Sequence, residues 1–224
     1  MHGRKYRNAA RTCDVMFANS AFTADDTAAT LGFPRERIVV AHPGIGAEFG
    51  IDGEVADLAA PYLLTVATLE PRKNLGTLVD AFALLADEGL SLAVVGGEGW
   101  GPQPRLDRPG VVRLGRVSDE ELARLYRGAG AVVYPSRFEG FGMPIIEAMA
   151  SGAPVVASSH PSMDEACGDA AVRADPESPE AIAAAIRDAL VRRDELRGKG
   201  LEHARGFSWE RTGETFLEGY LRFS

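Results

Sequence analysis

Several residue types and segment types are scarce in this chain of 224 residues, and each scarcity excludes a class of protein. The only cysteines, Cys13 and Cys167, lie far apart and lack the spacing of a zinc or redox motif. The four histidines are scattered, which argues against a protein zinc site. No stretch approaches the roughly 18 consecutive apolar residues of a membrane span, so no span is expected.

Positive charge is also in short supply. Lysine and arginine total 24 against 32 aspartates and glutamates, for a formal net charge of −8. A nucleic-acid-binding surface would need a basic stripe, so no nucleic-acid partner is expected. A small anion needs only a few local cations and stays open as a ligand. The first eleven residues are polar and basic, without the apolar segment of a signal peptide, so we expect a cytoplasmic location.

Helical and strand signals alternate along most of the chain. Short apolar runs typical of buried strands occur at 62–67, 92–95, 131–134 and 154–157, separated by segments whose apolar residues recur at helical spacing. Alternating strands and helices form a parallel sheet with helices on both faces. The sequence therefore predicts an α/β fold with a Rossmann-like doubly wound sheet, in which ligands bind beyond the carboxyl ends of the strands.

The apolar pattern breaks down between Pro43 and Ala60, which include four glycines and several acids. We interpret residues 46–60 as a linker between domains. A strand-helix-strand segment is expected before it at 1–45, and the main α/β domain after it at 61–206. A final amphipathic helix is expected within 207–224.

The first candidate site follows the predicted strand at 62–67. Thr68 is followed by the adjacent cations Arg72 and Lys73, and then by Asn74, which is expected to cap the next helix. An arginine fork, a lysine point charge and the N–H groups of a helix end together suit a diphosphate. The alternative is a pair of solvated surface charges, which is the commoner case for such a pair taken alone.

The second candidate site is the segment 139–147, after the strand ending at Tyr134. A helix is expected to begin at Pro144, a favoured first helical position. The carboxylates of Glu139 and Glu147 can each accept hydrogen bonds from neighbouring hydroxyls. The alternative is an ordinary glutamate offsetting the helix dipole. The backbone N–H groups expected to face a phosphate or sugar oxygen belong to Phe141, Gly142 and Met143.

Two further motifs are weaker. The glycine-rich loop at 96–101 has loose spacing for a dinucleotide site, and a loop over a ligand is the better interpretation. Ser118 and Glu121 form a capping box that needs no ligand. No Asp-x-Asp motif follows a strand, so a metal-bridged diphosphate is not expected.

In their order and spacing these segments resemble the retaining GT-B glycosyltransferases of family 4. The stretch EGFGMPIIEAMASGAPVVAS resembles that family's signature, and TVATLEPRKNLGTLVDAF resembles its diphosphate-binding turn, in the form seen in bacterial mannosyltransferase-like members. The resemblance covers residues 10 to 221 and implies that 61–206 is the C-terminal, donor-binding domain. Residues 1–45 then correspond to a remnant of the N-terminal domain, and the final helix at 207–224 returns toward that domain.

The resemblance also implies roles for individual residues. Arg72 and Lys73 would hold the donor diphosphate, and Glu139 would bind hydroxyls of the transferred sugar. Glu147 would accept from the ribose hydroxyls. The other donor-binding groups implied are the Thr68 hydroxyl, the backbone near Val117 for the base, and the backbone of Phe141, Gly142 and Met143. Arg137 stands where relatives often carry an apolar or small residue, and nothing in the sequence explains it.

The implied activity is transfer of a hexose, with mannose as the candidate, from a nucleotide-diphosphate sugar to a glycan or lipid-linked acceptor. GDP-mannose and UDP-sugars are the candidate donors, and no metal or cofactor is expected. One alternative is a non-catalytic or split-transferase module that binds nucleotide sugar and needs a partner chain, or self-association, through the first-domain remnant. Another is an epimerase or phosphorylase with the same donor half. Peripheral membrane contact of the full-length protein stays open.

Overall fold

A computed structural model describes residues 2–58, 61–102 and 104–223 of the chain. Of these, the residues up to Gly44 form one compact unit with those from Phe207 onward, and the residues from Ile45 to Gly206 form the other. The expected linker at 46–60 has its last two residues outside the described part. Residue 1 of the expected first segment and residue 224 of the expected last one also lie outside it.

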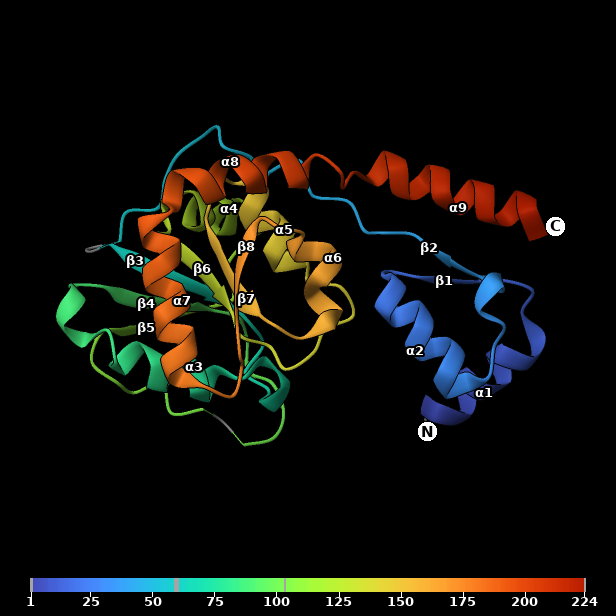
Figure 1. Ribbon diagram of the computed structural model, residues 1–224, viewed down its shortest axis with the longest axis horizontal. Coiled ribbons are helices and arrows are strands. Elements are labelled where there is room, and N and C mark those ends of the chain that lie inside the picture. The colour runs from blue at the N-terminus through green and yellow to red at the C-terminus, as the bar shows by residue number, and fades with distance from the viewer. Residues whose placement is uncertain (1, 59–60, 103, 224) are drawn as a thin grey trace. The chain divides into compact units, whose positions relative to one another are not determined.

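The larger unit contains a six-stranded sheet with the strand order β5-β4-β3-β6-β7-β8 (Figure 1). Every neighbouring pair of strands runs parallel. The order reverses between β3 and β6, so the predicted doubly wound parallel sheet is confirmed. The strands are β3 (Tyr62–Val66), β4 (Ser91–Val95), β5 (Val111–Gly115), β6 (Ala131–Tyr134), β7 (Val155–Ser158) and β8 (Ala171–Ala174).

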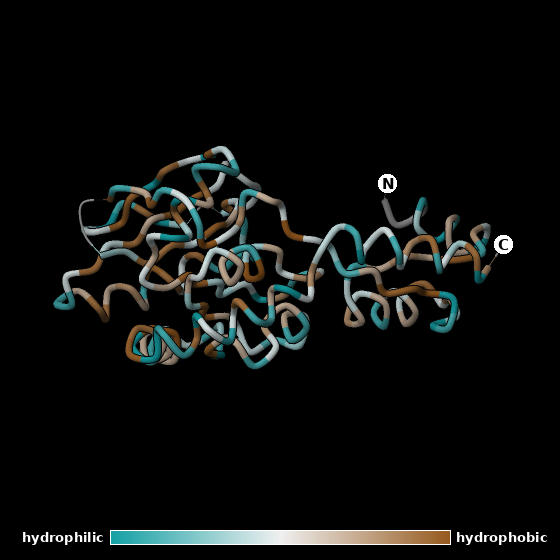
Figure 2. The backbone as a smooth tube through the Cα atoms, turned by 90° about the horizontal axis from the view of Figure 1, so that it is seen from above, coloured by the Kyte–Doolittle hydropathy of each residue, from teal (hydrophilic) through white to brown (hydrophobic). Residues whose placement is uncertain are grey.

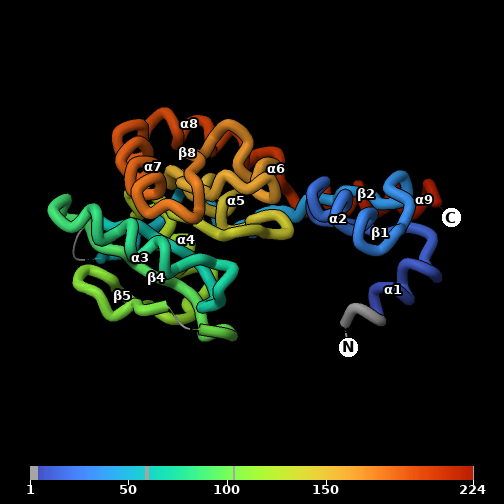
Figure 3. The backbone as a smooth tube through the Cα atoms, turned by 60° about the horizontal axis from the view of Figure 1, so that its bottom comes forward, coloured from blue at the N-terminus to red at the C-terminus, as the bar shows by residue number. Residues whose placement is uncertain are grey.

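Helices cover both faces of this sheet. On one face, α3 packs beside α7, as Figures 1 and 3 both show, and α7 also contacts β6, β7 and β8. On the other, α4 and α5 pack together, and α5 packs against α8. The helices of this unit are α3 (Leu75–Ala83), α4 (Asp119–Gly128), α5 (Met143–Ala150), α6 (Asp164–Cys167), α7 (Pro179–Val191) and α8 (Arg193–Ala204).

Several helices begin or end at residues whose side chain or backbone conformation caps the helix. The Ser118 and Ser178 hydroxyls accept from backbone N–H groups in the first turns of α4 and α7, at 3.2 and 3.1 Å. In the smaller unit, Ser20 caps α2 (Ala21–Leu31) in the same way, and Gly32 ends that helix with a left-handed φ of 66°. Hydrophobic and hydrophilic positions intersperse along the helices in Figure 2, as expected for helices with one buried face.

The smaller unit contains the parallel strands β1 (Met16–Ala18) and β2 (Ile38–Val40), joined through α2. The predicted strand-helix-strand arrangement is therefore confirmed. The sequence interpretation missed α1 (His2–Thr12), which has a polar and basic sequence. The last helix, α9 (Trp209–Phe223), belongs to the same unit, and the Phe17 ring lies 4.4 Å from the Phe216 ring. No helix in the described part of the chain is both long enough and apolar enough to cross a membrane.

The position of Gly96, in the glycine-rich loop after β4, requires glycine for two reasons. Its φ is 141°, which other residues rarely adopt, and it has no room for a side chain. A Cβ atom there would overlap the carbonyl oxygen of Ala67, because this loop lies directly against the end of β3. We expect Gly96→Ala to lower the free energy of unfolding by about 2 kcal/mol in urea denaturation. Gly76→Ala is the matched control, since its position in α3 is exposed and open, and it should stabilise by about 0.5 kcal/mol. Equal effects of the two changes would contradict the prediction.

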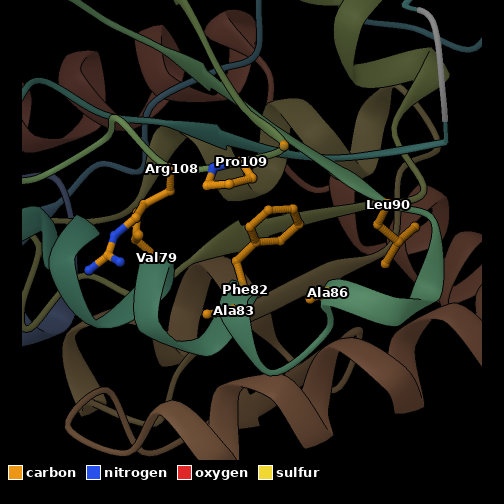
Figure 4. Close-up of a pocket in the computed structure, with 8 residues that line it drawn as sticks. Val79, Phe82, Ala83, Ala86, Leu90, Arg108 and Pro109 are labelled. Atoms are coloured by element: carbon orange, nitrogen blue, oxygen red, sulfur yellow. The ribbon is translucent and has the colours of Figure 1, made fainter.

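A cavity of about 370 Å³ lies between α3 and the segment before β5 (Figure 4). Phe82 and Leu90 contribute apolar side chains to its wall, and Arg108 contributes the charged one. Leu90 and Gly110 immediately precede β4 and β5, so the cavity lies at the amino ends of these strands. Ligands of doubly wound sheets bind at the opposite, carboxyl ends, and the candidate site is built there.

Candidate functional site

The two sequence-predicted clusters meet where the strand order reverses. The strands β3 and β6 are neighbours, with Leu63 paired to Ala131. The segment 68–74 follows β3, and the segment 139–147 follows β6. Both therefore leave the same edge of the sheet at the point where its two halves diverge, which is where such sheets bind ligands.

Glu139 is the centre of an ion-pair cluster at this edge. Its Oε1 atom lies 2.8 Å from the Lys73 Nζ, and its Oε2 atom lies 2.5 Å from the Arg72 Nη1. Arg72 also pairs with Glu70 at 2.6 Å through its other terminal nitrogen. The Glu139 side chain is 9% exposed and that of Lys73 is 12% exposed, so water screens this cluster much less than a surface pair.

Tyr134, the last residue of β6, completes the cluster. Its hydroxyl donates to the Oε1 of Glu139 at 3.0 Å and accepts from the Nζ of Lys73 at 2.7 Å. Burial and the adjacent carboxylate raise the pKa of Tyr134 well above its usual value, so the phenol keeps its proton. Burial alone would also raise the pKa of Glu139, but Lys73 and Arg72 outweigh it and leave that pKa below the ordinary value. Glu139 is therefore ionised at neutral pH.

The backbone of Glu139 is hydrogen-bonded to the turn that follows β7. Its N–H donates to the Ser162 hydroxyl at 2.9 Å, and Ser162 lies in the 3₁₀ turn Pro161–Met163 after β7. The His160 ring nitrogen Nδ1 lies 2.9 Å from the same hydroxyl. Neither Tyr134 nor Ser162 was a candidate from the sequence, because one looks like a strand residue and the other follows a strand without any recognisable motif.

Glu147 lies one turn into α5 and is half-buried. The buried Tyr126 hydroxyl on α4 donates to its Oε2 at 3.2 Å. Burial raises the pKa of Glu147 to about 7, and the carboxylates of Asp119 and Glu48 push it in the same direction, while the bond from Tyr126 opposes them. The two glutamates of the signature thus have different environments, because neighbouring cations lower the pKa of Glu139 while burial raises that of Glu147.

The remaining predicted donor-binding residues lie at the same edge of the sheet, with differences in detail. The helix α5 begins at Met143, one residue before the predicted start, and Gly142 precedes it with a φ of 105°. The Phe141 side chain is buried, so only its backbone can serve a ligand. Thr68 comes two residues after β3 and Val117 two after β5, and neither belongs to the ion-pair cluster.

Asn74 is the N-cap residue of α3, as predicted, but it does not cap that helix through its side chain. Asn74 precedes α3 with a left-handed φ of 58°, and its side chain makes no capping hydrogen bond to the helix backbone. Instead, its Nδ2 donates to the carbonyls of Pro135 and Pro176, at 3.2 and 2.6 Å. These bonds tie the turn after β3 to the loops after β6 and β8, and they compensate for the unusual backbone conformation.

A family model for glycosyl transferases group 1 matches residues 60–192. The chain belongs to this family. The O-antigen chain mannosyltransferase B of Escherichia coli is 41% identical over an alignment of 172 positions, gaps included, which covers 71% of this chain and 45% of that protein. A D-inositol 3-phosphate glycosyltransferase of Nocardia farcinica is 34% identical over an alignment of 235 positions, gaps included, which covers 92% of this chain and 52% of that protein. The chain spans about half the length of these group 1 relatives.

Solved structures share the fold of this group 1 chain. A glycosyltransferase from Rickettsia africae matches with a TM-score of 0.81 at 16% identity, over 98% of this chain and 67% of that one. Anabaena HepE, solved in complex with UDP and glucose, matches with a TM-score of 0.77 at 18% identity, over 96% and 65%. The family match and the shared fold confirm the resemblance drawn from the sequence motifs.

Proposed function

We propose that this chain is the donor-binding half of a retaining glycosyltransferase and holds a nucleotide-diphosphate sugar at the edge where β3 and β6 diverge. The observation that carries the proposal is the cluster of Arg72, Lys73 and Glu139 at that edge. A secluded pair of cations beside a carboxylate suits a ligand that combines phosphates with hydroxyl groups.

Arg72 and Lys73 bind the diphosphate in this proposal. Both lie in the 3₁₀ turn Pro71–Lys73, which fixes their order and direction. Both cations are paired with Glu139, which keeps two like charges close together and in place. When the sugar–phosphate bond breaks, the same cations stabilise the charge that develops on the departing diphosphate.

The two glutamates bind hydroxyls. The Oε1 of Glu139 already accepts from Lys73 and Tyr134, so we place a sugar hydroxyl at Oε2, on the side of Arg72. Glu147 accepts from the ribose hydroxyls of the nucleotide. The backbone of Phe141, Gly142 and Met143 faces the sugar and phosphate, and Thr68 and the backbone near Val117 complete the donor site.

The reaction breaks the anomeric C–O bond with retention, and the protein contributes positioning and charge stabilisation without a covalent carboxylate. Mannose is the proposed sugar, supported by the mannosyltransferase name of the relative that is 41% identical. The proposed acceptor is a glycan or a lipid-linked sugar. A cytoplasmic location is part of the proposal.

Binding of the donor tests this function directly. We expect isothermal calorimetry to detect GDP- or UDP-sugar binding in the millimolar to high-micromolar range, roughly −4 to −6 kcal/mol, because this chain spans only about half the length of its group 1 relatives. ADP-sugars serve as a third nucleotide class, and nucleoside monophosphates show how much the second phosphate contributes. A folded sample that gives no heat with any nucleotide sugar would refute the proposal.

A further inference from the structure

Arg137 comes shortly after β6 and reaches the neighbouring turn after β3. Its backbone N–H donates to the carbonyl of Arg72 at 2.9 Å, and its Nη1 donates to the carbonyl of Pro71 at 2.8 Å. Both acceptors lie in the 3₁₀ turn Pro71–Lys73. Arg137 therefore fastens the backbone of the turn that carries the two proposed diphosphate ligands.

Glu177, in the loop after β8, fixes the guanidinium of Arg137. It accepts from the Nε at 2.7 Å and from the Nη2 at 3.1 Å, a bidentate pair. Its own N–H donates to the Asp175 carboxylate at 2.9 Å, which orders this loop. The guanidinium thus bridges the loops after β3, β6 and β8, and Asn74 bridges the same three loops from the other end of the turn.

Arg137 pairs with Glu177 and not with Glu139, so it lies outside the ion-pair cluster that Arg72 and Lys73 share. The side chains of this pair are 42% and 60% exposed, and an exposed pair contributes little to global stability. The pair instead fixes the orientation of the Arg137 guanidinium. This group makes a bidentate contact with Glu177 and also donates to the Pro71 carbonyl. A lysine ammonium, which carries a point charge and lacks the planar fork, cannot reproduce that geometry.

We infer that Arg137 and Glu177 are positioning residues of the donor site, which hold the Pro71–Lys73 turn so that Arg72 and Lys73 point at the diphosphate. The inference rests on the proposed function and extends it to residues that need not touch the ligand. It also explains an arginine for which the sequence offered no reason.

The test compares nucleoside diphosphate and monophosphate affinities by NMR chemical-shift titration. The probes are GDP and GMP or UDP and UMP, whichever pair the unaltered chain binds better. In Arg137→Lys and in Glu177→Ala, we expect the preference for the diphosphate over the monophosphate to fall about tenfold, a change of about 1.4 kcal/mol. Thermal stability should change little, because the pair is exposed. Monophosphate affinity should change less than diphosphate affinity, because the proposed ligand of the turn's two cations is the diphosphate.

Arg187 supplies a matched control. It pairs with Glu88 at 2.7 Å and donates to the Leu84 carbonyl at 2.9 Å, so it makes a similar contact between α7 and the end of α3. Arg187→Lys should leave the phosphate preference unchanged. The same loss in this variant would show a general effect of weakened loops and overturn the positioning role.

The outcomes separate the inference from the proposed function. If the unaltered chain binds no nucleoside diphosphate, the proposed function fails. If it binds and both variants keep the full preference, the positioning role fails and the proposed function stands. If Glu177→Ala binds the diphosphate more tightly, Arg137 is a direct anion ligand released from its partner, which also overturns the inference. Should Arg137→Lys fail to fold, Glu177→Ala alone decides, because that side chain is 60% exposed.

Discussion

Lys73→Ala is expected to weaken nucleoside diphosphate binding by about 100-fold, near the upper end of what a hydrogen bond to a charged group contributes. The Lys73 side chain is 12% exposed, and its ammonium donates to both the Tyr134 hydroxyl and the Glu139 carboxylate. Its removal takes away one of the two phosphate ligands. It also leaves the Glu139 carboxylate less compensated beside an incoming anion, so attraction is lost and repulsion is added.

The balance of charges at the site makes this loss large. Arg72 and Lys73 face two carboxylates, those of Glu70 and Glu139, so the formal charges of these four groups sum to zero. A diphosphate can bind only if the cations turn part of their hydrogen bonding toward it. Without Lys73, the three remaining groups carry a net charge of about −1. Their repulsion of the anionic diphosphate is strong because the groups are close and poorly screened by water.

An NMR titration with the nucleoside diphosphate that the unaltered chain prefers measures the effect. For Lys73→Ala we expect shifts that do not approach saturation. Lys199→Ala removes the same charge from α8, where Lys199 pairs with Glu195 on the helix surface, and should bind like the unaltered chain. Equal affinities for the Lys73 variant and the unaltered chain would remove Lys73 from the proposed site.

The sheet edge could be predicted because each motif directly follows an apolar run. An apolar run such as 62–67 indicates a buried strand, and alternation with helices indicates parallel order, which collects the carboxyl ends on one side. The segments 68–74 and 139–147 therefore had to share an edge. That they lie on neighbouring strands follows only from the strand order, which the sequence pattern leaves open.

The partners of Glu139 could not be predicted, because they depend on contacts between distant segments. Tyr134 ends an apolar run, so the sequence pattern predicts a core residue. Its hydroxyl belongs to the site because the fold brings the Lys73 Nζ within 2.7 Å of it. The side-chain contacts of Asn74, the N-cap residue of α3, could not be predicted for a related reason. An asparagine before a helix favours a cap, but two tertiary hydrogen bonds to proline carbonyls hold it in a left-handed conformation instead. Local preference was overridden by tertiary contacts at the site itself.

Glu147 should make the chain less stable as pH rises, the opposite of an ordinary ion-paired carboxylate. Burial raises its pKa from 4.5 to about 7 in the folded chain. Between these two values the folded chain holds a proton that the unfolded chain has released, so the free energy of unfolding falls as pH increases through this window. Above it, a charged and half-buried carboxylate remains beside Asp119 and Glu48. A shift of this size corresponds to a cost of about 3 kcal/mol.

Glu147→Gln should remove this cost, because a neutral amide can still accept from the Tyr126 hydroxyl. In urea denaturation we expect the variant to be more stable than the unaltered chain by about 3 kcal/mol at pH 8, and by about 1 kcal/mol or less at pH 5. Glu202→Gln, a matching change at a side chain that is 75% exposed, should leave the pH dependence as it is. A Glu147→Gln variant that is less stable at pH 8, or equally changed at both pH values, would contradict this account.

If the proposed ribose contact also holds, the same variant binds nucleotide more weakly, because a carboxylate accepts more strongly from hydroxyls than an amide does. The Glu147 carboxylate would then lower the stability of the chain and strengthen nucleotide binding through the same negative charge.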